Sequence, residues 1–282
     1  MIRNLFYSVW AVKHSDEWLK NVNHLLEYAY VFNGRKIVVI RSDKDSVKPA
    51  EVEAVFSEAL PNVEFVHRRN NPRLGEVEGF IQDFGKLYSL RDDEITFYAH
   101  TKGVSYHAEG DSVKVQAVRT WRDAMYRGCL GELGRVQEAL KTYACAGCFK
   151  DIIPGHRRWH YAGTFWWVNH KRLFELDWKS IPETYYGTEQ YLGLLIPPES
   201  AYTIFQESPF HLYQETNLYD RFPQLCSHCW YSETSIATWP GDFTKHCPQC
   251  GGGMRGRTRE LEATIPNRRR WDLASRKKLR DR

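Results

Sequence analysis

The first hundred residues alternate between short apolar runs and segments with the periodicity of amphipathic helices. From length and from β-branched and aromatic content, we predict strands at residues 4–10, 36–40, 63–67 and 94–99. We predict helices at residues 15–31, capped by Ser15 or Asp16, at 49–60, opened by Pro49, and at 75–90. This alternation predicts an α/β fold with a mostly parallel sheet flanked by helices, in which ligands bind at the carboxyl ends of the strands.

The second half of the chain continues with fewer and shorter elements. We predict a mainly helical segment at residues 112–142, a strand at 160–170 and a short helix at 188–195. Trp166 and Trp167 would alternate across that strand, so at least one of them belongs in the core. No run approaches the ~20 apolar residues of a membrane span, and the first residues lack the features of a signal peptide. We therefore expect no membrane span and a cytoplasmic location, in the host cytoplasm if the source is viral.

Cysteines are concentrated in C-x-x-C pairs. Two of the pairs, CSHC and CPQC, are separated by seventeen residues and contain Cys226, Cys229, Cys247 and Cys250. This spacing predicts a zinc ribbon, because each pair directs two thiolates at one tetrahedral Zn²⁺ ion. Four cysteines leave no open coordination position, so the zinc would be structural. The ribbon would act either as a structural clasp alone or also as a surface for nucleic acid or a partner. Cys145 and Cys148 form a third pair, which we expect to be buried free thiols.

Positive charge is concentrated at the end of the chain. The net charge is +4, but residues 255–282 alone carry +7 and the remainder carries −3. A basic end of this kind is either a solvated tail or a contact for polyanions. We predict an α/β domain at residues 1–215, the zinc ribbon at 216–256 and a basic tail at 257–282.

Three motifs carry a resemblance to a known family. They are FYAHTKGVSY at residues 97–106, WRDAMYRG at 121–128 and HYAGTFWWVNHKRL at 160–173. Through them the sequence resembles nucleotide-sugar glycosyltransferases of the GT-A class, more narrowly a bacterial and viral group with an H-T-K-G element. The resemblance covers about residues 4–205 and leaves out the ribbon and the tail. It implies a GT-A-like, Rossmann-type fold and transfer of a sugar from a nucleotide-sugar donor to a hydroxyl acceptor.

The strand end at H-T-K-G departs from the pattern of that class. GT-A enzymes usually carry an Asp-x-Asp there, which holds a divalent metal on the donor diphosphate, whereas this chain has His100, Thr101 and Lys102. A requirement for Mn²⁺ or Mg²⁺ is therefore left open. A cation and a hydroxyl can neutralise diphosphate charge directly, and Gly103 lets backbone N–H groups approach. His100 would ligate a metal or donate to a phosphate. The alternative is an exposed loop that binds nothing.

The resemblance also places the donor nucleotide at the ends of the first three strands. The residues it implicates there are Trp10, Arg41 and Asp43. Asp43 would accept bonds from ribose hydroxyls or the base, or would simply cap a loop. The run HRRNNPR adds Arg68, Arg69 and Arg73 as phosphate partners, with a solvated loop as the alternative.

On the acceptor side, the resemblance implicates a later acidic residue and the G-x-F-W-W strand. Glu189 would be the general base of an inverting transfer, or else a structural helix residue; a retaining transfer would not use it in this way. The floor between donor and acceptor would consist of Gly163, Thr164, Phe165 and Trp166. The ribbon and tail favour a polyanionic acceptor, and our first candidate is a hydroxylated base in phage-type DNA. The second candidate acceptor is a polysaccharide or lipid-linked glycan. A non-catalytic zinc-ribbon protein that binds nucleic acid is the competing class.

Overall fold

The structure is a computed structural model that describes residues 1–104, 112–152 and 159–205. The chain divides into two compact units, Met1–Leu225 and Cys226–Arg282, and every described residue belongs to the first. The predicted domain boundaries near residues 215 and 256, the four zinc cysteines and the basic tail lie outside the described residues.

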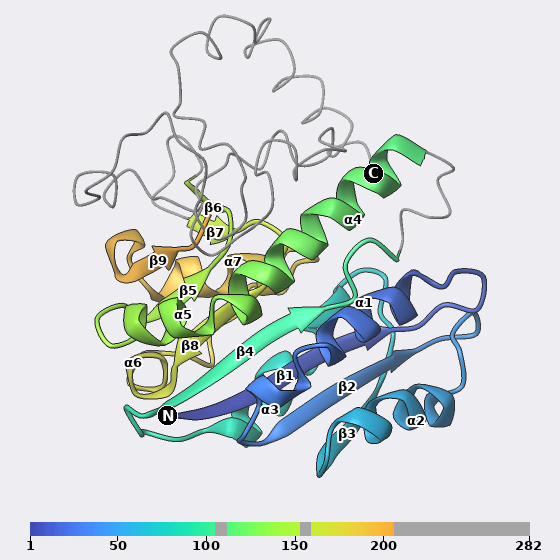
Figure 1. Cartoon of the computed structure of the whole chain (residues 1–282), viewed down its shortest axis with the longest axis horizontal. Coiled ribbons are helices and arrows are strands. Elements are labelled where there is room, and N and C mark those ends of the chain that lie inside the picture. The colour runs from blue at the N-terminus through green and yellow to red at the C-terminus, as the bar shows by residue number, and fades with distance from the viewer. Residues whose placement is uncertain (105–111, 153–158, 206–282) are drawn as a thin grey trace, which may run out of the picture. The chain divides into compact units, whose positions relative to one another are not determined.

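Seven strands of the described residues form one twisted sheet in the order β3-β2-β1-β4-β8-β5-β9 (Figure 1). The parallel strands are β1 (Ile2–Trp10), β2 (Lys36–Ser42), β3 (Val63–Arg69) and β4 (Glu94–His100). The remaining strands are β8 (Trp166–Asn169), antiparallel to β4, β5 (Cys145–Gly147), antiparallel to β8, and β9 (Ala201–Thr203), parallel to β5. A separate two-stranded sheet pairs β6 (Lys150–Ile152) with β7 (Trp159–Tyr161). The predicted α/β fold with a mostly parallel sheet is confirmed.

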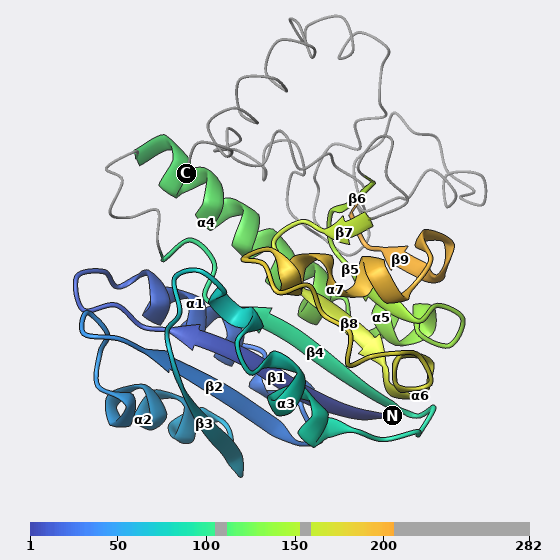
Figure 2. The same cartoon turned by 180° about the vertical axis from the view of Figure 1, so that it is seen from behind.

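Helices cover both faces of this sheet (Figures 1 and 2). One face carries α1 (Glu17–Leu26), α2 (Pro49–Ala59) and α4 (Ser112–Tyr126). The other carries α3 (Phe80–Phe84), α6 (His170–Phe174) and α7 (Gly187–Leu195). Adjacent residues of β1 serve the two layers, because side chains alternate along a strand. Tyr7 packs 5.8 Å from Phe56 of α2, and Phe6 packs 5.6 Å from Phe80 of α3, measured between ring centroids.

The early elements mostly follow the hydrophobic pattern. The four predicted strands and the helix opened by Pro49 are confirmed, and the strands are one or two residues longer than expected. The helix predicted for residues 15–31 is too long, since α1 ends at Leu26 and only a 3-10 turn, Ala29–Val31, follows. Its start is held by Ser15, whose hydroxyl accepts the Glu17 N–H at 3.2 Å.

The single helix predicted for residues 75–90 is wrong. The segment contains a 3-10 turn (Gly75–Val77), the five-residue α3 and a second 3-10 turn (Gly85–Leu87). Gly79 has a φ of +74°, which interrupts a right-handed helix. The Arg41 guanidinium also binds the carbonyl oxygens of Glu76 and Glu78, at 2.8 and 3.0 Å, so these acceptors are taken by a side chain.

The strand predicted for residues 160–170 is also wrong, because it is two strands in two sheets. A turn at Gly163 and Thr164, with φ of +89° and +64°, separates β7 from β8. After this turn, both tryptophans are buried, on opposite faces. Trp166 packs against Tyr98, and Trp167 packs against Phe97. The prediction that at least one belongs in the core is confirmed.

The mainly helical segment predicted for residues 112–142 is confirmed, with one irregularity. A π-helix, Arg127–Gly131, joins α4 to α5 (Leu133–Ala139). The Trp167 indole N–H donates to the Cys129 carbonyl at 2.7 Å, which supports a wider turn at this point. Cys145 and Cys148 are buried free thiols, as expected. In the part of the chain that the structure describes, no helix is both long enough and apolar enough to cross a membrane.

Candidate functional site at the carboxyl edge of the sheet

The strand order reverses at β1, which lies between β2 and β4, and H-T-K-G follows directly at the carboxyl end of β4. The pairing of β1 with β4 continues to Ser8 opposite His100. One residue later, the Thr101 N–H donates to the Ser8 carbonyl at 3.1 Å. The Thr101 hydroxyl accepts the Trp10 N–H at 3.0 Å. The polar strand end therefore closes onto the end of β1, at the switch point where open α/β sheets bind ligands.

His100 uses both ring nitrogens within the protein. Nδ1 lies 3.1 Å from a Glu76 carboxylate oxygen, and Nε2 lies 3.1 Å from the Gly163 carbonyl. Burial alone would raise the pKa of Glu76, but the neighbouring His100 and Arg41 outweigh it and lower that pKa to about 2. Because an ionised carboxylate and a carbonyl can only accept, both contacts are hydrogen bonds when the imidazole is doubly protonated. Neither nitrogen is left to ligate a metal while these bonds persist.

Arg41 is buried beneath this edge rather than exposed at it. Its Nε donates to the Ser8 hydroxyl at 3.0 Å, and its Nη2 donates to the carbonyls of Glu76 and Glu78. The Nη1 atom is buried and has no hydrogen-bond partner among the described residues. Arg41 was expected to contact the donor. In the structure it fixes the loop that presents Glu76 to His100.

Lys102 and Gly103 are anchored to the helices beside the sheet. The Lys102 ammonium lies 4.1 Å from the centroid of the Trp121 ring, within cation–π range, and Lys102 is partly exposed. Its backbone N–H and carbonyl both bond the Asn21 side chain of α1, at 3.1 and 3.0 Å. Gly103 has a φ of +86°, and a Cβ there would lie 2.5 Å from Val118. The cation is thus held by α1 and α4 close to the strand end.

A buried charge network joins the same two helices. Glu17, at the start of α1, bonds Arg119 of α4 at 3.0 Å and Arg122 at 3.3 Å. Burial would raise the pKa of Glu17, but the hydrogen bonds from Arg119 and Lys20 outweigh it and lower that pKa to about 2. This network fixes the α1–α4 pair that holds Lys102.

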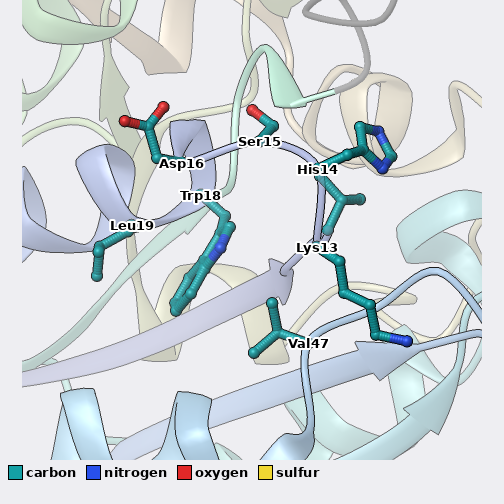
Figure 3. Close-up of a pocket in the computed structure, with 8 residues that line it drawn as sticks. Lys13, His14, Ser15, Asp16, Trp18, Leu19 and Val47 are labelled. Atoms are coloured by element: carbon teal, nitrogen blue, oxygen red, sulfur yellow. The ribbon is translucent and has the colours of Figure 1, made fainter.

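A cavity of about 390 Å³ opens where β1 leads into α1 (Figure 3). Its lining residues are Val12, Lys13, His14, Ser15, Asp16, Trp18, Leu19 and Val47. Its volume lies at the lower end of the range for small-molecule sites. The cavity begins two residues after Trp10, and Trp10 itself is partly exposed.

Asp43 shapes the loop beneath this cavity. Its carboxylate accepts the Ser46 hydroxyl at 2.8 Å, the Asp45 N–H at 3.0 Å and the Asn70 amide at 2.8 Å. Burial would raise the pKa of Asp43, but these bonds outweigh it and the pKa is lowered. The same loop supplies Val47 to the cavity, so loop capping, one of the two roles expected for Asp43, is present.

The G-x-F-W-W segment meets the site at His100. Phe165 and Trp166 have exposed fractions of 0% and 2%, so these side chains belong to the core, and Thr164 is also buried. Two of its groups contact His100. The Gly163 carbonyl lies 3.1 Å from Nε2, and the Phe165 ring packs edge-on with a ring centroid 6.0 Å from that of the imidazole.

Glu189 lies in the first turn of α7, with one carboxylate oxygen 3.7 Å from His160 Nε2. Its side chain is 27% exposed. The loop that carries Glu76 packs against this helix start, where a Cβ on Gly187 would lie 2.7 Å from Val77. The structure thus brings Glu76, His100 and Gly163 together and places Glu189 on the helix that supports the same loop.

Three important residues were missed from the sequence, namely Glu17, Asn21 and Glu76. Only Glu17 carries a local signal, because it follows the expected cap at Ser15. Among the described residues, no group of three or more His, Cys, Asp and Glu side chains is arranged to hold a metal ion. No protein-family model matches the chain, and no curated protein is similar to it.

Proposed function

We propose that this protein is a glycosyltransferase that moves a sugar from a nucleotide-sugar donor to a hydroxyl acceptor. The position of H-T-K-G at the carboxyl end of β4, beside the end of β1 and next to a cavity of about 390 Å³, carries this proposal. Ligands of open α/β sheets bind at this kind of switch point. The Lys102 ammonium and Lys13, which lines the cavity, supply positive charge for a diphosphate.

The transfer would be inverting and would use Glu189 as its general base. Glu189 takes the proton of the acceptor hydroxyl while that oxygen forms a bond to the anomeric carbon. The bond between this carbon and the diphosphate oxygen breaks, and the nucleoside diphosphate leaves with the electron pair. The Lys102 ammonium stabilises the negative charge that develops on the leaving group. A divalent cation, Mn²⁺ or Mg²⁺, would add to this stabilisation if the reaction uses one.

The acceptor we propose is a hydroxylated base in phage-type DNA. The four-cysteine zinc motif and the +7 charge of residues 255–282 favour a polyanionic acceptor over a neutral one. A base within a duplex must leave the stack before its hydroxyl reaches the site. A polysaccharide or lipid-linked glycan is the second candidate within the same reaction class.

Incubation of the purified chain with a panel of nucleotide sugars tests the reaction. Donor hydrolysis or a rise in Tm with at least one donor is expected, and no response to any donor would refute the proposal. With an active donor, Glu189→Gln should abolish turnover and retain the donor-induced rise in Tm. The matched control is Glu199→Gln, an exposed glutamate in the turn Pro198–Ser200. Mass spectrometry of hydroxymethylated DNA after the reaction identifies the acceptor.

The competing function is a non-catalytic nucleic-acid-binding protein with the ribbon as its working part. The four cysteines and the basic tail favour this second candidate. Salt-sensitive DNA binding together with no response to any nucleotide sugar would support it over the glycosyltransferase.

A further inference from the structure

Two tyrosines are exposed side by side at the start of α7. Tyr185 and Tyr186 have exposed fractions of 52% and 45%, and their ring centroids are 5.3 Å apart at an interplanar angle of 86°. Tyr186 is the N-cap residue of the helix, three residues before Glu189. The two rings form an aromatic corner with solvent-accessible area beside the proposed general base.

Two arginines, Arg69 at the end of β3 and Arg73 on the loop that follows, have no partner for their charge among the described residues. Arg69 and Arg73 are exposed, and among the described residues neither guanidinium has a hydrogen-bond or ion-pair partner. Every other described arginine is engaged. Arg68, for example, bonds both carboxylate oxygens of the buried Asp83, at 3.0 and 2.6 Å. One of the predicted phosphate partners is therefore structural, and the other two keep their charge available.

The loop and the aromatic corner form one surface. Arg73 lies inside a turn in which the Gly75 N–H donates to the Asn71 carbonyl at 2.7 Å. A Cβ placed on Gly75 would lie 3.4 Å from the Tyr185 ring, so the ring lies against the end of that turn. Arg69 is not part of this surface. Side chains alternate along β3, and His67, two residues before Arg69, pairs with Glu53 of α2, whereas Arg68 pairs with Asp83 of α3. The surface defined by Arg73, Tyr185 and Tyr186 is called the aromatic–arginine surface below.

We propose that the aromatic–arginine surface binds an unpaired strand of nucleic acid. Arg73 contacts a phosphate of the strand, and an unstacked base lies against the tyrosine pair. Exposed aromatic rings beside a cationic track are the features by which proteins hold single strands, since every base offers a flat π-face. A duplex keeps its bases stacked and offers the rings nothing to stack on. The +7 charge of residues 255–282 suits the same polyanion.

This surface also refines the acceptor side of the proposed function. β3, which ends at Arg69, lies two strands from β1, or about 10 Å at the usual strand spacing. The loop after β3 then leads past Tyr185 toward α7 and Glu189. We therefore assign Arg73 to the acceptor strand rather than to the donor diphosphate. Only this assignment rests on the proposed function, because binding of a single strand can be measured without any transfer.

Fluorescence anisotropy of the full-length chain with a labelled oligothymidylate of about 16 nucleotides tests the proposal. Tyr185→Ala should raise the Kd by about 5- to 150-fold, the range found when a stacking ring is removed. Arg73→Gln should lower the slope of log K against log salt by about 0.7, the value for one lost phosphate contact on a single strand.

The matched controls are Tyr30→Ala and Arg91→Gln. Tyr30 is 77% exposed, and Arg91 pairs with Asp93; both lie near the amino end of the sheet. Neither change should alter the Kd more than twofold, and the Tm of each variant confirms that it is folded.

Wild-type Kd values in Tyr185→Ala and Arg73→Gln would overturn the proposal. So would equal losses for an oligonucleotide and a sulfated polysaccharide, which would identify a general polyanion site. A third contrary outcome is loss of nucleoside diphosphate affinity in Arg73→Gln with unchanged oligonucleotide affinity. Because the donor panel is a separate measurement, strand binding without any donor response would retain this inference and refute the glycosyltransferase.

Discussion

Replacing Glu76 by glutamine tests whether the charge pair with His100 stabilises the carboxyl edge. The substitution keeps an oxygen that can accept from His100 Nδ1 but removes the negative charge. In the folded protein the pKa of Glu76 falls from 4.5 to about 2, because the effects of His100 and Arg41 outweigh that of burial. At about 1.36 kcal/mol for each tenfold change in the dissociation constant, this corresponds to about 3 kcal/mol. The free energy of unfolding at pH 7 should fall by that amount.

The pH dependence of this loss distinguishes a charge effect from a packing effect. Because the folded pKa lies below the unfolded one, the stabilisation is fully present above about pH 4.5 and disappears as the pH falls toward about 2. The difference between wild type and Glu76→Gln should therefore shrink from about 3 kcal/mol at pH 7 to less than half of that at about pH 3. Glu17 titrates in the same window in both proteins, so it cancels from the difference.

Urea unfolding followed by tryptophan fluorescence at several pH values gives both quantities. The matched control is Glu58→Gln, an exposed glutamate on α2, which should change stability by less than about 0.5 kcal/mol. A loss below about 1 kcal/mol for Glu76→Gln at pH 7 would refute the reasoning. A large loss that does not change between pH 7 and pH 3 would refute it as well, since it would arise from packing.

Three further predictions concern the turn after β7, the H-T-K-G cation and the zinc motif. Gly163→Ala should lower the free energy of unfolding in urea by about 2 to 4 kcal/mol, because φ is +89° and the new Cβ would lie 2.6 Å from the Met125 sulfur. The control Gly134→Ala, whose Cβ would have no atom within 4 Å, should leave this free energy unchanged or raise it. Equal effects of the two substitutions would contradict the prediction. Lys102→Ala should weaken donor binding about tenfold, measured by calorimetry. The control Lys179→Ala removes a similar cation–π contact over Trp178 and should leave donor affinity unchanged. Unchanged affinity and turnover in Lys102→Ala would refute the proposed role of Lys102. Elemental analysis should find one zinc ion per chain, which a chelator or Cys226→Ser removes, and a zinc-free full-length chain would exclude the ribbon.

Strand and helix order could be predicted from local pattern, but the path of the loops could not. The parallel strands are short apolar runs with clear ends, so their positions follow from the residues themselves. The segment after Gly75 has an amphipathic pattern that would suit a helix, yet Arg41 on β2 takes its carbonyl oxygens. No local pattern reports a hydrogen bond between residues 35 positions apart. The break at Gly163 could have been found, since a glycine within an aromatic run is a common sign of a turn.

The candidate site shows the same division. The location of His100, Thr101 and Lys102 at a strand end follows from the alternation of elements, and the structure agrees. The hydrogen-bond partners of these side chains cannot be predicted from that alternation. Both His100 nitrogens and the Thr101 hydroxyl are engaged within the protein, which only the folded contacts reveal. Phe165 and Trp166, expected beside the acceptor, are core residues, because Phe165 packs against Tyr126 of α4 and Trp166 packs against Phe84 of α3.

The loop between β3 and α3 has a consequence for any attempt to recombine this domain with another. Arg41 of β2 donates a hydrogen bond to the Glu76 carbonyl of this loop, and Val77 of the loop packs closely against Gly187 of α7. β2, the loop and α7 are distant in the sequence, but they must therefore be exchanged together if the loop is to keep its conformation. A chimera that exchanges α7 alone should misplace Glu76, and one that carries β2, the loop and α7 together should keep it. The smallest unit that can be transferred with this site intact is therefore a set of contacting segments, not a continuous stretch of sequence.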